Sequence, residues 1–114
     1  MQVIKNECKE EQKVAVVLFS EWDDAKDEAR IRKYAEWSKN KEKGMAWWQK
    51  KIKEGVVKSV SLWSDNAGHN IVWVEFDSID KFAKLWGDEE YHKLSMEGLP
   101  LVDNYRVRLM RPSI

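Results

Sequence analysis

The chain has 114 residues, which is the length of a single domain, and its twenty acidic and twenty basic residues cancel to a net charge of zero. No overall field therefore attracts nucleic acid, an anionic membrane or a highly charged substrate. The single cysteine, Cys8, excludes an internal disulfide and gives no metal-ligand spacing, so we expect a reducing, cytoplasmic compartment.

The first segment, residues 1–12, is polar and weakly patterned, and we treat it as an arm before one domain of residues 13–114. It lacks the apolar stretch of a signal peptide. No apolar run in the chain reaches the roughly 18 residues of a membrane span. The sequence therefore predicts no membrane partner.

A continuous apolar run, Val14 to Phe19, predicts a strand that is buried on both faces. A helix is expected from Asp23 or Asp24, because acidic residues stabilise the first turn of a helix. Four apolar residues fall near one face of this helix: Ala25, Ala29, Tyr34 and Trp37.

The stretch 39–44 has no apolar residue and ends in Gly44, so we predict that the helix stops or kinks there. A second helical segment then carries Met45, Trp48 and Ile52 to Gly55. The two segments together precede the next pair of strands.

A β-hairpin is predicted over residues 57–76, with Asn66, Ala67 and Gly68 as its loop and Gly68 in the left-handed conformation. This loop fixes the register, because strand residues alternate between the two faces of a sheet. One face then carries Ser59, Ser61, Trp63, Ile71, Trp73 and Glu75. The opposite, aliphatic face carries Val60, Leu62, Val72, Val74 and Phe76.

After the hairpin, Asp77 and Ser78 precede an amphipathic helix whose apolar residues are Ile79, Phe82, Ala83 and Trp86. A short helix led by acidic residues follows Gly87. The last strand, 102–110, alternates apolar residues with Asn104, Arg106 and Arg108, so one of its faces is cationic.

The element order βαββαβ predicts an α+β, ferredoxin-like sandwich: a four-stranded antiparallel sheet with its helices on one face. Helices cover only the aliphatic side, so Trp63, Trp73 and the two arginines are left on the other. An apolar patch of this size usually marks an interface or a ligand site. We therefore predict a homodimer, in which two sheets meet through these faces and form an α/β barrel.

The passages IVWVEFDSIDKF, residues 71–82, and WGDEEYH, residues 86–92, look like the strand, capped helix and short acidic helix of a known group of proteins. From about Lys13 to Met110 the chain resembles the dimeric α/β barrel superfamily. This superfamily includes antibiotic-biosynthesis-type monooxygenases, haem-degrading enzymes and stress-responsive barrel proteins. The resemblance implies a homodimer with a pocket and points to no single reaction.

The candidate ligand site lies on the predicted dimer face. Trp63 and Trp73 offer stacking area to a small planar or apolar molecule, with Ser61 between them on the face. Arg106 and Arg108 offer charge to a carboxylate or enolate, and Glu75 can accept or move a proton. In the alternative interpretation the same groups form only the core of a dimer, with Glu75 paired to one of these arginines across the interface.

An oxygenase is the second hypothesis. Cofactor-free monooxygenases and haem-degrading members of the superfamily use an Asn, a Trp and sometimes a His. The resemblance would assign Trp63 or Trp73 as the Trp and His92 as a helix-borne catalytic His. The first strand contains no Asn, so the triad cannot be transferred to this chain, and His92 also fits a partly exposed helix residue without a catalytic role.

Other classes of site lack their motifs. Two histidines and one cysteine, far apart, make no metal-ligand set, and there is neither a nucleophile elbow nor a glycine-rich phosphate loop. The third strand lacks the basic, glycine-aromatic pattern of RNA-recognition domains. We predict no metal, no cofactor and no nucleic-acid partner.

Overall fold

The computed structural model describes residues 15–39 and 41–113. Its elements run in the order β1 (Val16–Asp24), α2 (Glu28–Ser38), α3 (Lys41–Lys53), β2 (Ser59–Ser64), β3 (His69–Phe76), α4 (Ile79–Trp86), α5 (Glu89–Gly98), the 3-10 turn η1 (Leu99–Leu101) and β4 (Val102–Met110). The polar arm predicted for residues 1–12 lies outside the described residues.

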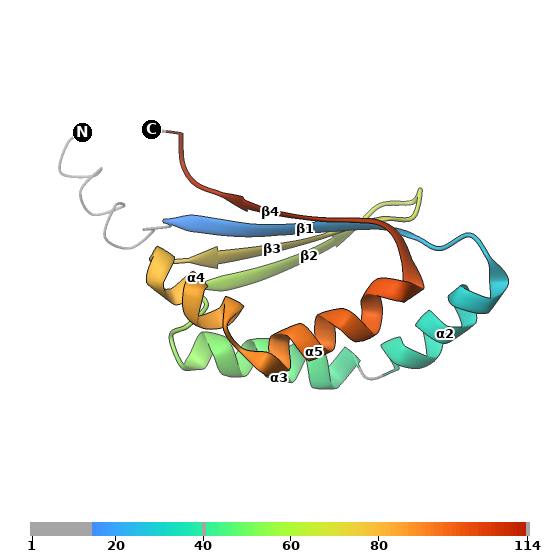
Figure 1. Cartoon of the computed structure of the whole chain (residues 1–114), viewed down its shortest axis with the longest axis horizontal. Coiled ribbons are helices and arrows are strands. Elements are labelled where there is room, and N and C mark those ends of the chain that lie inside the picture. The colour runs from blue at the N-terminus through green and yellow to red at the C-terminus, as the bar shows by residue number, and fades with distance from the viewer. Residues whose placement is uncertain (1–14, 40, 114) are drawn as a thin grey trace.

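The four strands in the described ranges form one antiparallel sheet in the order β2-β3-β1-β4, and helices α2 to α5 lie on the same side of it (Figure 1). This is the ferredoxin-like arrangement that the sequence predicted. None of the helices in the described ranges is long and apolar enough to cross a membrane. We call the side of the sheet that carries none of the described helices the open face.

The hairpin register is confirmed residue by residue. Ser59 pairs with Glu75, Ser61 with Trp73 and Trp63 with Ile71. Gly68 has a φ of 83°, and the backbone N–H of Asp65 donates to the carbonyl oxygen of His69 at 3.0 Å. The residues predicted to share a face therefore do so.

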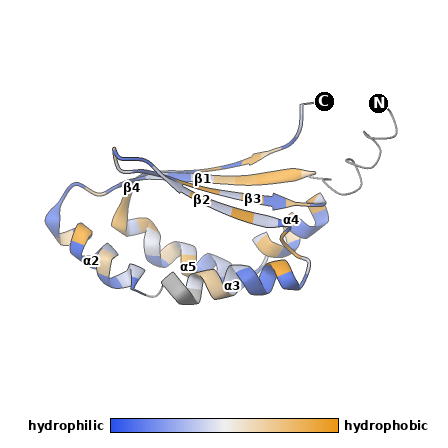
Figure 2. Cartoon of the chain, turned by 180° about the vertical axis from the view of Figure 1, so that it is seen from behind, coloured by the Kyte–Doolittle hydropathy of each residue, from blue (hydrophilic) through white to orange (hydrophobic). Residues whose placement is uncertain are grey.

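The hydrophobic core lies between the sheet and the helices. Its buried residues are Val16, Leu18, Val56, Val57, Val74, Phe76, Leu85 and Tyr91. The first strand was predicted to be buried on both faces, and this is confirmed for its first residues. Val17 and Leu18 point to opposite faces of the sheet, and Val17 is only 7% exposed. The first half of β1 is accordingly among the most hydrophobic parts of the chain (Figure 2).

The predicted start of the first helix is wrong. The first strand continues to Asp24, because Glu21, Trp22 and Asp23 pair with the beginning of β3. Helix α2 begins only at Glu28, where the side chain of Asp27 accepts a hydrogen bond from the backbone N–H of Arg30 at 3.1 Å.

The break between the two helical segments is confirmed, although it is narrower than predicted. Helix α2 ends at Ser38 and α3 begins at Lys41, so Gly44 lies inside α3 and does not interrupt it. Helix α4 begins after Ser78, whose side chain accepts from the backbone N–H of Lys81 at 3.2 Å, as the capping pattern predicted.

Phe76 is fully buried and meets the edge of Phe82 at a centroid distance of 5.6 Å. We expect Phe76→Ala to lower the free energy of unfolding by about 3–5 kcal/mol, the usual cost of a cavity of this size. Urea unfolding followed by circular dichroism measures the change. The exposed Ile79→Ala should cost less than about 0.5 kcal/mol, and an equal loss in both variants would contradict the assignment of the core.

Candidate functional site

Two adjoining cavities lie between the helices and the sheet. The larger has a volume of about 540 Å³ and the smaller about 130 Å³, and both are bordered by Trp22, Tyr34, Trp37 and Leu94. The larger is further lined by Ser38, Gly44, Met45, Trp48, Leu62, Trp63, Ser64, Asn70, Ile71 and Glu97. The smaller is completed by Ser95, Gly98, Leu99, Val102 and Tyr105.

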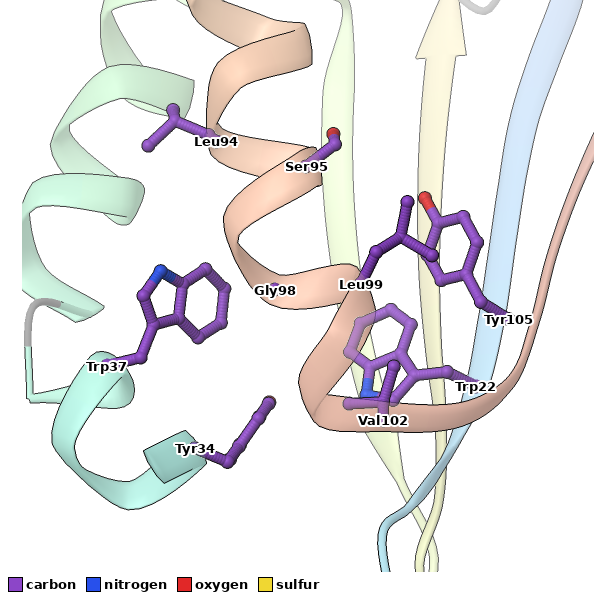
Figure 3. A pocket seen from close by; sticks show the side chains of 9 residues that line it. All are labelled: Trp22, Tyr34, Trp37, Leu94, Ser95, Gly98, Leu99, Val102 and Tyr105. Atoms are coloured by element: carbon purple, nitrogen blue, oxygen red, sulfur yellow. The ribbon is translucent and has the colours of Figure 1, made fainter. Parts of the chain in front are cut away.

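Aromatic side chains reach the smaller cavity from two layers (Figure 3). Tyr34 and Trp37 come from α2 and contact each other at a centroid distance of 5.6 Å. From the sheet, Trp22 of β1 and Tyr105 of β4 stack at 6.3 Å with an interplanar angle of 26°. The site therefore depends on how α2 is held over the end of the sheet.

Trp37 rests directly on α5. A Cβ atom at Gly98 would lie 2.9 Å from Cη2 of Trp37, so only glycine permits this approach. The indole N–H of Trp37 donates to Oε2 of Glu97 at 3.3 Å. Gly98 and Glu97 together fix the position of this aromatic wall.

The start of α2 is tied to the start of β4 by Arg30. Its guanidinium lies 2.8 Å from Oδ1 of Asp103 and 2.5 Å from Oδ1 of Asp27, and also donates to the carbonyl oxygen of Val102 at 3.4 Å. Hydrogen bonds from Arg30 hold the pKa of Asp27 below its usual range. By contrast, α2 contributes no buried residue to the core.

A second aromatic group continues from the larger cavity into the core. Trp48 meets the edge of Trp47 at 4.9 Å, and Trp47 stacks on Tyr91 at 6.1 Å with an interplanar angle of 22°. Burial raises the pKa of Tyr91 to about 12, so its hydroxyl remains protonated at neutral pH.

The structure brings part of the sequence-predicted site together on the open face. The indole N–H of Trp73 donates to Oε2 of Glu75 at 3.2 Å, and the hydroxyl of Ser59 donates to Oε1 of Glu75 at 2.7 Å. Ser61 is the register partner of Trp73 on this face, and Phe19 meets the edge of the same indole at 6.1 Å. Both carboxylate oxygens of Glu75 are thus engaged within the chain.

The remaining predicted residues lie apart from Glu75. Arg106 and Arg108 are on the open face of β4, opposite Glu21 and Phe19 of β1, and a guanidinium nitrogen of Arg106 is 3.8 Å from Glu21. Trp63 is 65% exposed and borders the larger cavity.

His92 lies on α5, away from the sheet, where its ring contacts Trp86 and Tyr91. Its Nε2 is also hydrogen-bonded to the carbonyl oxygen of Trp86.

Sequence reasoning missed a charged cluster at the hairpin end of the open face. Nδ1 of His69 lies 2.7 Å from Oδ1 of Asp23, and its Nε2 lies 3.5 Å from Oε2 of Glu21. The amide of Asn104 donates to the other oxygen of Asp23 at 2.8 Å. The predicted first strand ended at Phe19, whereas β1 continues to Asp24, and only this longer strand places Asp23 opposite His69.

Asp23 and His69 shift each other's protonation. The hydrogen bond with Asp23 raises the pKa of His69, and the same bond, with one from Asn104, lowers the pKa of Asp23. No group of three or more possible metal-ligating side chains occurs among the described residues. The cluster is therefore best described as an ion pair on the sheet surface.

The shifted pKa values predict how this ion pair affects stability. The folded pKa of His69 lies above its ordinary value of 6.5, so the pair stabilises fully below that pH and loses this contribution as the pH rises through the folded pKa. The lowered pKa of Asp23 preserves the pair until the pH falls below the ordinary carboxylate range.

We therefore expect His69→Asn to lower the urea midpoint more at about pH 5.5 than at about pH 8.5. Asp23→Asn should remove most of this pH dependence. An equal effect of His69→Asn at both pH values would show that the pair does not form.

No protein-family model matches the chain, and no curated protein matches it either. Solved structures do match it. One is a candidate antibiotic biosynthesis monooxygenase from Deinococcus radiodurans, with a TM-score of 0.63, 9% identity, and coverage of 87% of this chain and 93% of that one. Another is a dimeric, ferredoxin-like protein of unknown function from Bacteroides fragilis, with a TM-score of 0.60, 10% identity, and coverage of 85% and 96%.

A third is a monooxygenase from Streptomyces coelicolor in complex with the ligand nanaomycin D. It has a TM-score of 0.60 and 15% identity, and the match covers 90% of this chain and 91% of that one. At these identities the comparisons establish the fold, and the chain has the ferredoxin-like fold of antibiotic-biosynthesis-monooxygenase-like proteins.

Proposed function

We propose that this protein binds a small planar aromatic molecule in the larger cavity between its sheet and its helices. The observation that carries the proposal is the cavity itself, which holds about 540 Å³ and is lined by indoles from β1, α2 and α3. Cavities of this size with apolar walls and a few polar groups are the usual form of small-molecule sites.

The lining also indicates the charge of the ligand. Glu97 is the ionisable carboxylate that borders the larger cavity, and its oxygen already accepts the indole N–H of Trp37. The described lining residues include neither Lys nor Arg. Among these described residues an anionic ligand would find no cation, so we propose a neutral aromatic molecule as the ligand.

The open face is a different kind of surface, and we propose that a second copy of the chain covers it. Trp63, the register partner of Ile71, is 65% exposed, and the side chain of Arg106 is more than half exposed. The Bacteroides fragilis protein of the same fold is described as dimeric. Ligand-binding roles for Ser61, Trp63, Trp73, Arg106 and Arg108, and catalytic roles for Glu75 and His92, stay predictions.

A monooxygenase is the second candidate function. It is favoured by the Streptomyces coelicolor structure, in which a monooxygenase of this fold holds nanaomycin D. Binding comes first in either function, because a substrate of such an enzyme has to occupy a cavity before it reacts. Oxygen uptake on addition of 1,4-dihydroxynaphthalene, above the rate without protein, separates turnover from binding.

The cavity proposal predicts that 9-fluorenone, a planar tricyclic ketone, binds to the wild-type protein in equilibrium dialysis. Trp37→Ala removes one aromatic wall of the cavity, and we expect it to weaken binding about tenfold or more. Trp37→Phe keeps an aromatic ring at the same place and should retain most of the affinity.

Trp73→Ala is the matched control, because this indole lies on the open face and does not border the cavity. We expect it to leave the dissociation constant of 9-fluorenone within a factor of about two. The opposite result, with binding lost in Trp73→Ala and kept in Trp37→Ala, would place the ligand on the open face.

The dimer proposal predicts that light scattering on the purified protein gives twice the monomer mass. Trp63→Ser should weaken the dimer at least about tenfold, because large aromatic side chains that an interface buries contribute strongly to association. Met96→Ser is the control, since Met96 is also 65% exposed but lies on α5, away from the open face. A monomeric wild-type protein, or equal effects of both variants, would refute this interface.

A further inference from the structure

One polar atom at the cavity has no partner. Among the described residues, the indole nitrogen Nε1 of Trp22 is the buried side-chain nitrogen or oxygen without a hydrogen bond. Trp22 borders both cavities, and so does Tyr34. A buried donor without an acceptor lowers the stability of the folded protein, so such a group is expected to have a structural or functional reason.

A polar group close to this nitrogen comes from Tyr34. The indole of Trp22 lies close enough to the phenol to oppose part of the rise in the pKa of Tyr34, yet the contact falls short of a hydrogen bond. An indole N–H only donates, so any bond between these groups must use the oxygen of Tyr34 as the acceptor. The hydroxyl hydrogen of Tyr34 then points away from Trp22.

The other two tyrosines of the chain have a different kind of polar neighbour. The hydroxyl of Ser95 is the polar neighbour of Tyr91, and the hydroxyl of Ser20 is the polar neighbour of Tyr105. A serine hydroxyl both donates and accepts, so either tyrosine can give its proton to that neighbour. Tyr34 faces a pure donor instead, and its own proton has no acceptor in Trp22.

Tyr34 also remains protonated. Burial, with a smaller contribution from the charge of Asp24, raises the pKa of its phenol above the ordinary value. Oδ1 of Asp24 accepts from the amide of Asn70 at 2.8 Å, and no hydrogen bond joins Asp24 to Tyr34 among the described residues. The phenol is therefore a neutral hydrogen-bond donor at the junction of the two cavities.

We propose that Tyr34 is the specificity-determining donor of the cavity, that its O–H binds a carbonyl oxygen of an aromatic ligand, and that the N–H of Trp22 orients it by occupying its oxygen. A chain of bonds from Trp22 through Tyr34 to the ligand strengthens each member. It also satisfies the indole N–H, which has no partner without ligand. This assignment rests on the proposed ligand cavity and adds the functional group that the cavity selects.

The experiment compares 9-fluorenone with fluorene, which differ only in the replacement of the carbonyl group by a methylene. Equilibrium dialysis at concentrations below the solubility of fluorene gives both dissociation constants. We expect the wild-type protein to prefer the ketone by about 3- to 10-fold, the effect of one hydrogen bond between neutral groups. Tyr34→Phe should abolish this preference and leave the affinity for fluorene within a factor of about two.

Two further variants separate recognition from packing. Trp22→Phe should reduce the preference for the ketone, because it removes the N–H that would occupy the oxygen of Tyr34. Tyr91→Phe is the control, since Tyr91 borders neither cavity and should keep the full preference.

Each other outcome counts against the assignment. If Tyr34→Phe kept the preference for 9-fluorenone over fluorene, the role of the hydroxyl would be refuted. If the variant lost affinity for both compounds equally, Tyr34 would contribute only packing. If neither compound binds to the wild-type protein, the cavity proposal itself fails. If both bind equally well, the cavity stands and only the hydrogen-bond assignment falls.

Discussion

The register of the β2–β3 hairpin is the constraint on which both surfaces of the sheet depend. The loop that ends at Gly68, with its φ of 83°, pairs Trp63 with Ile71 and Ser61 with Trp73. A shift by one residue would exchange every side chain between the open face and the helix-covered face. Val74 and Phe76 would then leave the core, and Trp73 and Glu75 would enter it.

The same register shows which parts of the fold the sequence specifies locally. A turn with glycine at one position, followed by strict alternation, was enough to assign both faces of the hairpin. The spacing of Ile79, Phe82 and Trp86 was likewise enough for α4, because a repeat of three and four residues places them on one side of a helix. These features depend on neighbours within a few residues.

The cavity depends on contacts between distant segments, so the pattern of neighbouring residues did not predict it. Tyr34 and Trp37 were correctly assigned to one side of a helix, but that pattern usually indicates core packing. Their role as a cavity wall depends on Gly98, sixty-one positions beyond Trp37, and on the strand extending to Asp24. Acidic residues such as Asp23 and Asp24 are typical of the first turn of a helix, yet here they belong to a strand, and their side chains are hydrogen-bonded to His69 and Asn70.

Helix α2 combines two properties that have a consequence for the motions of the protein. It forms one wall of the cavity, yet it contributes no buried residue, and its preceding segment and the break after Ser38 separate it from its neighbours. Detaching it exposes Tyr34 and Trp37 and breaks the ion pair of Arg30 with Asp103 but opens no part of the buried core, so it costs less free energy than unfolding the sheet. Amide hydrogens of α2 should then exchange with solvent sooner than those of β1, and a molecule can enter and leave the cavity while the β-sheet stays intact.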